Sequence, residues 1–200
     1  MDEKKTPESN RFLTSLPLKI YEAIKALTEY VVEIDGVYRE MARFEVREPL
    51  NRVAPQFFAT AHRCLNGMAF VLIRDLTGTA QSQARGKKRL NTSLRGLLTA
   101  AYGSEADAPA ELIELADRAH RATNVPEWAS RVIAHNDVET MLEIEPLPPV
   151  LRGDVGVVGK LLRQFVNLFE TRWGIERTQW REPILVKQVG NLVAVLNREL

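Results

Sequence analysis

Apolar residues recur at alternating steps of four and three in the first part of the chain, which is the period of one face of an α-helix. The positions are Ile20, Ile24, Leu27, Val31, Ile34, Tyr38 and Met41. Just before them, Ser15 and Pro17 provide a cap residue and a proline in the first helical turn. The pattern predicts a long first helix that lies against one partner helix through a heptad-like seam.

A second helix is predicted over 56–78, where apolar residues recur with the same period and Gly78 provides the stop. The stretch 64–73 is apolar nearly all round. We therefore expect this helix to be central. Upstream of it, Pro49 and Pro55 bracket a predicted connection between the two helices.

Amphipathic helices are also predicted along the rest of the chain. Their expected ranges are 93–102, 108–121 and 126–142, followed by one that ends at Gly174 and one that starts at Pro183 with Leu185, Val189, Leu192 and Leu196 on one face. The stretch 79–88 lacks an apolar period and predicts a polar loop. Because no segment shows the alternation typical of strands, the predicted fold class is all-α: an antiparallel helical bundle with a long first helix and a C-terminal helix.

The chain is expected to comprise three parts: a disordered polar leader over 1–14, a helical bundle over 15–175, and a C-terminal helix over 176–200 that packs on the bundle. The leader has no apolar segment of the kind found in signal peptides. The uncharged run over 64–73 is ten residues long, far short of a membrane span. These observations predict a cytoplasmic protein without a membrane partner.

The charge balance and the cysteine count exclude several classes of protein. The net charge is +1, from 27 basic and 26 acidic residues, which excludes a globally basic nucleic-acid binder but not a local basic patch. The single cysteine, Cys64, is expected in the core, and it excludes an internal disulfide framework and a cysteine-based zinc cluster. His62, His120 and His135 form no His-x-x-x-His pair, so we predict neither a metal nor a cofactor.

Charges are segregated along the chain: residues 85–95 contain bases and no acid, whereas residues 105–117 contain acids and no base. The basic residues are Arg85, Lys87, Lys88, Arg89 and Arg95. Blocks of this kind often form solvated faces and salt bridges between helices. Alternatively, the segment attracts an anionic polymer such as RNA, because clustered cations neutralise phosphates and release counterions.

His135 follows Arg131 by four residues, so the two side chains are neighbours on one face of the predicted helix. An imidazole with a pKa near ~6.5 exchanges a proton at neutral pH. A guanidinium holds a phosphate through two hydrogen bonds. Together these groups supply what metal-free RNA cleavage needs, whereas the alternative is a structural histidine at a helix interface. We expect His62 in the core or at its boundary, and His120 in solvent.

Four segments of the chain resemble successive blocks of AbiU-type HEPN domains, the abortive-infection branch of the HEPN superfamily. They are LNRVAPQFFATAHRCLNGMAFVLIRDLTG, KKRLNTSLRGLL, WASRVIAHNDVETML and EPLPPVLRGDVGVVGKLLRQFVNLFETRWG. The resemblance spans about residues 18–175. It implies an antiparallel helical bundle that dimerises, and many superfamily members are metal-independent endoribonucleases in phage defence or toxin action.

The family motif is an arginine separated by four to six residues from a histidine, and the histidine corresponds to His135. The arginine has no counterpart, because Trp128, Ala129 and Ser130 occupy the positions at those separations. Arg131 stands closer, with three residues in between. Either Arg131 substitutes from the same helical face, or the chain has kept the fold and lost catalysis.

The resemblance implies His135 as general acid and base, Arg131 as phosphate anchor, and Asn136 and Asp137 as supporting polar groups. The partners it implies are RNA, a second copy of the chain, and an antitoxin or another component of a defence system. The leading hypothesis is therefore a metal-independent endoribonuclease in phage defence or toxin action. The alternative is a catalytically silent module that binds RNA, a nucleotide or a partner protein.

Overall fold

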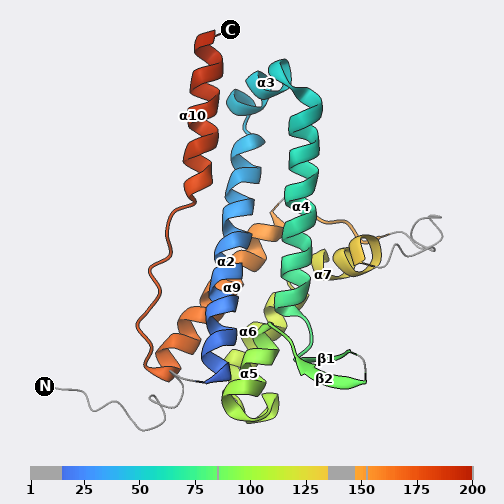
Figure 1. The fold of residues 1–200 in the computed structure, drawn as a ribbon, viewed down its shortest axis with the longest axis vertical. Coiled ribbons are helices and arrows are strands. Elements are labelled where there is room, and N and C mark those ends of the chain that lie inside the picture. Colours follow the sequence, from blue (N-terminus) through green and yellow to red (C-terminus); the bar gives the residue numbers. More distant parts are fainter. Residues whose placement is uncertain (1–14, 85, 135–146, 152, 200) are drawn as a thin grey trace, which may run out of the picture.

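The protein is described here from a computed structural model, which describes residues 15–84, 86–134, 147–151 and 153–199. It is an all-α bundle, as predicted, with one small hairpin at its side (Figure 1). The elements are α2 (Leu16–Met41), α3 (Phe44–Val53), α4 (Pro55–Thr77), β1 (Gln81–Ala84), β2 (Lys87–Leu90), α5 (Leu94–Tyr102), α6 (Ala110–Arg121), α7 (Val125–Trp128), a π-helical turn (Ala129–Ala134), α9 (Asp154–Trp173) and α10 (Ile184–Glu199). The predicted leader over 1–14 lies outside the described residues.

The first helix, α2, begins and ends where its sequence pattern predicts, but it has more than one partner. It contacts α4, α5, α9 and α10 and is the central helix of the bundle (Figure 1). Ile24 and Val31 of the predicted seam are fully buried, and Tyr21 and Thr28 are buried outside the seam. The prediction of a single partner helix was wrong, because α2 buries more of its circumference than one heptad seam covers.

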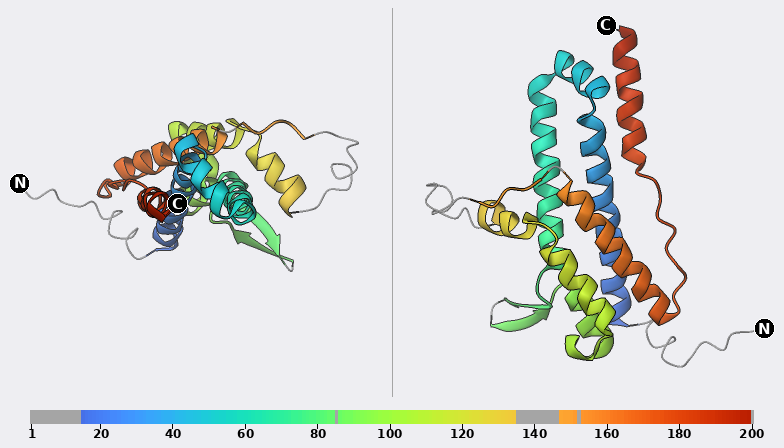
Figure 2. Two further views of the ribbon diagram at one scale, coloured as in Figure 1. Left: turned by 90° about the horizontal axis from the view of Figure 1, so that it is seen from above. Right: turned by 180° about the vertical axis from the view of Figure 1, so that it is seen from behind.

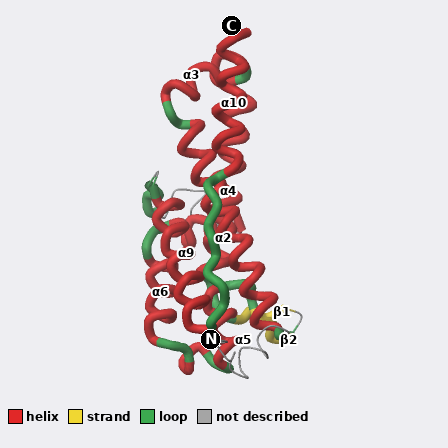
Figure 3. The backbone as a smooth tube through the Cα atoms, turned by 90° about the vertical axis from the view of Figure 1, so that its left-hand side faces the viewer, coloured by secondary structure: helices red, strands yellow, loops and turns green. Residues whose placement is uncertain are grey.

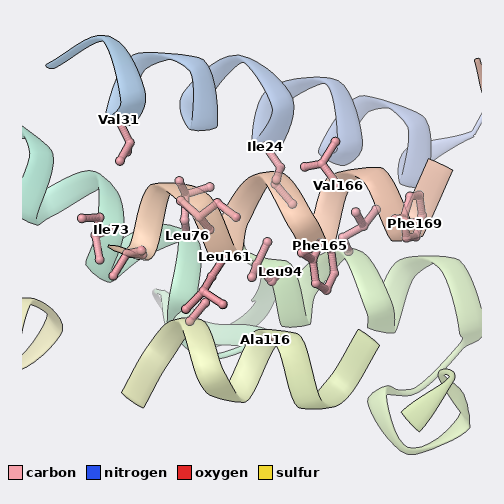
Figure 4. Packing of buried hydrophobic residues seen from close by; sticks show 14 of the residues in the cluster. Ile24, Val31, Ile73, Leu76, Leu94, Ala116, Leu161, Phe165, Val166 and Phe169 are labelled. Carbon is pink, nitrogen blue, oxygen red and sulfur yellow. The ribbon is translucent and has the colours of Figure 1, made fainter. Parts of the chain in front are cut away.

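The main core lies between α2, α9, α4, α5 and α6 (Figure 4). Ile24 and Val166 fill the contact between α2 and α9, and Leu161 and Ala116 fill the contact between α9 and α6. Helix α9 ends at Gly174, whose φ of +61° suits a glycine in the left-handed region. The predicted stop at this glycine is therefore confirmed.

Helix α4 contacts α2, α3, α5, α6, α7 and α9, but only its last turns are buried, so the prediction that it is central holds for that part alone. Its buried residues are confined to its last turns, at Ala69, Ile73, Leu76 and Thr77. Met68 is 48% exposed, and Cys64, expected in the core, is exposed. The apolar stretch over 64–73 presents one side to the bundle and leaves the other uncovered, which its composition does not reveal.

The expected connection between Pro49 and Pro55 is instead a helix. Helix α3 continues through Pro49 to Val53, and Pro55 occupies the first turn of α4. Proline within a helix removes one backbone hydrogen bond. Burial compensates for this loss: Val46 and Leu50 form a second, smaller core with Val193 of α10.

The chain returns from α9 to α10 along α2 as an extended segment without helix or strand (Figure 3). Helix α10 then packs against α2 and α3 at the end of the bundle remote from α5 (Figure 3). Of its predicted apolar face, Leu185 and Leu192 are 46% and 43% exposed, and Val193 is buried in their place. No helix in the described ranges is long and apolar enough to cross a membrane.

Candidate nucleic-acid interface

A β-hairpin occupies the stretch predicted as a polar loop, so that prediction was wrong. Strand β1 pairs antiparallel with β2, from Gln81 opposite Leu90 to Ala84 opposite Lys87. Gly86, with φ of +72°, lies in the two-residue turn between them. Every residue of β2 is exposed, so the strand buries neither face and its sequence shows no alternation.

Hydrogen bonds fix the root of the hairpin to the start of α5. The carbonyl oxygen of Thr79 accepts from the side-chain amide of Asn91 at 2.9 Å and from the hydroxyl of Ser93 at 3.0 Å. The same hydroxyl accepts the N–H of Gly96 at 3.0 Å and thereby caps α5. A Cβ at Gly96 would lie 2.1 Å from the carbonyl oxygen of Asn91, so the close approach requires glycine. The hairpin therefore has a rigid base.

Three consecutive cations, Lys87, Lys88 and Arg89, are exposed on β2. Their cross-strand neighbours on β1 are Ala84, Gln83 and Ser82, which carry no charge. No carboxylate of the described residues forms a salt bridge with any of the three. The hairpin therefore presents a local positive charge on a molecule whose net charge is only +1. Arg85, predicted in the same cluster, lies outside the described residues.

Arg95, the last residue of the basic block, has a different environment. Its guanidinium pairs with Glu105 and with Asp117 of α6. Asp117 also accepts from Arg121 at 2.8 Å. Arg95 therefore forms salt bridges, as the first interpretation of the charge blocks expects. The second interpretation, attraction of an anionic polymer, applies to the hairpin.

Arg131 lies in the π-helical turn that follows α7, and its side chain is 16% exposed. Its Nη1 lies 3.4 Å from Oε1 of Glu127, one turn earlier. Trp128 packs edge to face on Phe70 of α4, with ring centroids 5.9 Å apart, and this contact fixes the start of the segment. His135, Asn136 and Asp137 lie outside the described residues, so their predicted arrangement with Arg131 stays a prediction.

The other two histidines lie in ordinary environments. His62 is partly buried and stacks on Tyr38 of α2, with ring centroids 4.1 Å apart, in line with the boundary position expected for it. His120 is exposed, and its Nδ1 lies 3.4 Å from the hydroxyl of Thr77.

Sequence reasoning missed a buried carboxylate on α2, close to Gly156 of α9. Asp35 is 3% exposed and pairs with Arg39, one turn later on α2. It lines a cavity of about 470 Å³ together with Tyr38, Phe70 and Trp128. In the sequence, Asp35 stands beside the apolar seam and Arg39 follows it by four residues. An acid and a base at this spacing are also common on exposed helices, so the pattern does not reveal that Asp35 is buried.

Comparison with known proteins gives no match: no family model, no curated protein and no solved structure is similar enough to this chain to be recognised. The likeness to AbiU-type HEPN domains therefore rests on the sequence segments alone, and membership of that family stays a prediction.

Proposed function

We propose that this protein binds RNA and that the hairpin contacts the phosphates. The observation that carries the proposal is the row of exposed cations at Lys87, Lys88 and Arg89, on a hairpin with a fixed root and without carboxylate neighbours in the described part of the chain. Cations placed in this way neutralise phosphates and release counterions. Because the hairpin has little apolar surface, a phosphate backbone fits it better than a protein partner does.

The placement of Arg131 supports the same proposal. The hairpin and the segment that carries Arg131 both project from the side of the bundle opposite α10 (Figures 1 and 2). A single strand of RNA that runs along this side would contact both the hairpin and the segment that carries Arg131. Arg131 would exchange its contact with Glu127 for the phosphate, which an arginine binds through two parallel hydrogen bonds.

The binding experiment compares the variant Lys87→Gln/Lys88→Gln/Arg89→Gln with the unaltered protein on single-stranded RNA at several salt concentrations. We expect weaker binding and a salt-dependence slope smaller by about 2, since each phosphate contact on a single strand contributes ~0.7 to the slope. The matched control carries Gln at Lys19, Lys160 and Lys187, three exposed lysines on the bundle helices, and should bind RNA as the unaltered protein does. Equal losses in the two variants would contradict the proposal.

A second candidate function is metal-independent RNA cleavage by Arg131 and His135, with Asn136 and Asp137 in support. It is favoured by the π-helical turn at Arg131, because such turns occur frequently at functional sites. In this reaction the ribose 2′-oxygen forms a bond to the adjacent phosphorus and the bond to the 5′-oxygen breaks, which leaves a 2′,3′-cyclic phosphate and a 5′-hydroxyl. His135 would move the proton, and Arg131 would stabilise the charged phosphorane.

Cleavage is tested on labelled total RNA and transfer RNA in the presence of EDTA, with His135→Ala and Arg131→Ala alongside. Metal-independent catalysis predicts cleavage that survives chelation and is lost in the histidine variant. RNA binding without cleavage in every sample would favour the catalytically silent module. Light scattering of the same samples tests the dimer that a composite site requires, since a monomer cannot bring two copies of the motif together.

A further inference from the structure

A cavity of about 660 Å³ lies between α2, α3 and α4, at the end of the bundle where α3 crosses from α2 to α4 (Figure 1). Each of the three helices contributes side chains that line it. The stacked rings of Tyr38 and His62 separate it from the cavity beside Asp35. We call this separate cavity the α3 cup. Its volume lies within the range of roughly 300–1,000 Å³ that is typical of small-molecule sites.

The inner surface of the α3 cup is apolar. It is formed by Met41, Leu50 and Phe58, of which Leu50 is buried and the other two are partly buried. All three belong to the smaller core, so the inner surface rests on packed side chains. An apolar group that covers this surface gains free energy because both partners leave water. A nucleobase or a sugar would instead give up hydrogen bonds to water that these side chains cannot replace.

The rim of the α3 cup is cationic. Arg47 of α3 and Arg63 of α4 line the cup and are exposed, and neither forms a salt bridge with a carboxylate of the described residues. Among the described residues that line the cup, none is acidic. The carboxylates of the neighbouring turns pair with other bases: Glu40 and Glu45 with Arg43, and Glu48 with Arg52. The rim therefore carries positive charge that no neighbouring side chain balances.

We propose that the α3 cup binds a medium-chain carboxylate, with the chain on the apolar inner surface and the carboxylate between Arg47 and Arg63. A guanidinium binds a carboxylate through two parallel N–H···O hydrogen bonds. Charge complementarity selects an anion over a neutral or cationic amphiphile. The apolar inner surface selects an aliphatic chain over a polar body. This site goes beyond RNA binding and uses no residue of the hairpin.

The first test is isothermal titration of the full-length protein with butyrate, hexanoate and octanoate. The affinity should rise along this series by up to about fourfold for each added methylene, because each one buries further apolar surface. Hexanol and hexylammonium have the same chain as hexanoate with a neutral and a cationic end. Hexanoate should bind more tightly than hexanol, and hexylammonium should bind most weakly.

The variant Arg47→Gln/Arg63→Gln tests the rim. It should weaken the binding of octanoate about tenfold or more, because hydrogen bonds to a charged group are lost, and it should leave the binding of hexanol unchanged. Arg177→Gln is the matched control, since Arg177 is an exposed arginine in the segment after α9 and does not line the cup. Thermal unfolding followed by circular dichroism establishes that each variant is folded.

Nuclear magnetic resonance of the protein with labelled methionine methyl groups locates the chain. Octanoate should shift the signal of Met41, which lines the cup, and leave unchanged that of Met68, which is exposed on α4 and does not line it. The Lys87→Gln/Lys88→Gln/Arg89→Gln variant should keep its affinity for octanoate, so this proposal and RNA binding by the hairpin can fail separately.

Four results would overturn the proposal. They are equal binding of hexanoate and hexanol, unchanged octanoate binding by the folded rim variant, equal shifts of Met41 and Met68, and no octanoate binding at millimolar concentration.

Discussion

The hydroxyl of Tyr21 donates a 2.7 Å hydrogen bond to Oε1 of Glu170, and both side chains are buried. The two residues are 149 positions apart and join α2 to α9 in the main core. Glu170 also accepts the backbone N–H of Thr178 at 2.9 Å and the hydroxyl of the same residue. The buried carboxylate of Glu170 thus connects α2, α9 and the segment that leads to α10.

This pair predicts how stability changes at alkaline pH. Burial, and then the hydrogen bond to Glu170, raise the pKa of Tyr21 above its ordinary value of 10.0. The neutral phenol is therefore favoured in the folded state. Above pH ~10 the unfolded chain releases a proton that the folded protein retains, so the free energy of unfolding falls as the pH rises. Urea unfolding between pH 8 and pH 11 measures this fall, and Tyr21→Phe, which cannot ionise, should reduce it.

Replacing Glu170 should destabilise the protein strongly. In Glu170→Ala, the hydroxyl of Tyr21 and the two donors of Thr178 lose their acceptor, at a cost of about 1–3 kcal/mol for a buried unpaired group. Glu170→Gln keeps one carbonyl oxygen and should be less harmful. Chemical unfolding of both variants gives the comparison, and equal stability of the Ala variant and the unaltered protein would contradict it.

The tight approach at the root of the hairpin predicts the effect of Gly96→Ala. The new Cβ would meet the backbone oxygen of Asn91, which cannot turn aside as a flexible side chain can. We expect a loss of stability of about 1–3 kcal/mol and weaker binding of RNA, because the hairpin would be displaced from its position. Gly103→Ala is a useful comparison: no atom lies within 4 Å of its Cβ, so its cost comes only from the positive φ of +86°.

The smaller core predicts that the α3–α10 end of the molecule unfolds more readily than the main core. Leu50→Ala should cost about 2–5 kcal/mol of local stability, because Leu50 is 2% exposed and packs with Val46 and Val193. Hydrogen exchange should quicken in α3 and α10 but not in α5. Leu97→Ala, in the main core, should instead quicken exchange throughout the protein.

The proposed cleavage activity has a cellular consequence. Expression of the unaltered protein in bacteria should slow growth if it cleaves RNA, and His135→Ala should restore growth at equal protein levels. A silent RNA-binding module should be tolerated in both forms. Slow growth that persists in the histidine variant would assign the effect to something other than His135.

Much of the helical architecture could be predicted because it depends on local features. Ser15 and Pro17 start α2, Ser93 caps α5, and Gly174 ends α9 in the left-handed region. Each of these effects operates within one or two helical turns, so the residues nearby are sufficient to predict it. The period of apolar residues places the helices between these ends in the same way.

The hairpin could not be predicted from the same information. Gln81 to Ala84 and Lys87 to Leu90 pair through their backbones, and the sequence of β2 contains no alternation because both of its faces are exposed. The turn at Gly86 lacks the Asn-Gly or Asp-Gly pair that signals a tight hairpin. Backbone pairing without a buried face leaves little trace in the choice of side chains.

The sequence by itself therefore determined an all-α protein, most of its helix ends and a local basic cluster, whereas the Arg131–His135 pair stays a prediction. Only the tertiary structure decided which apolar faces are covered, so that Cys64 is exposed and Pro49 is buried within a helix. It also decided that Asp35 is buried opposite Gly156, 121 positions later in the chain. The physical reason is range: caps and periodicity act within a few residues, whereas burial depends on which distant helices pack on each face.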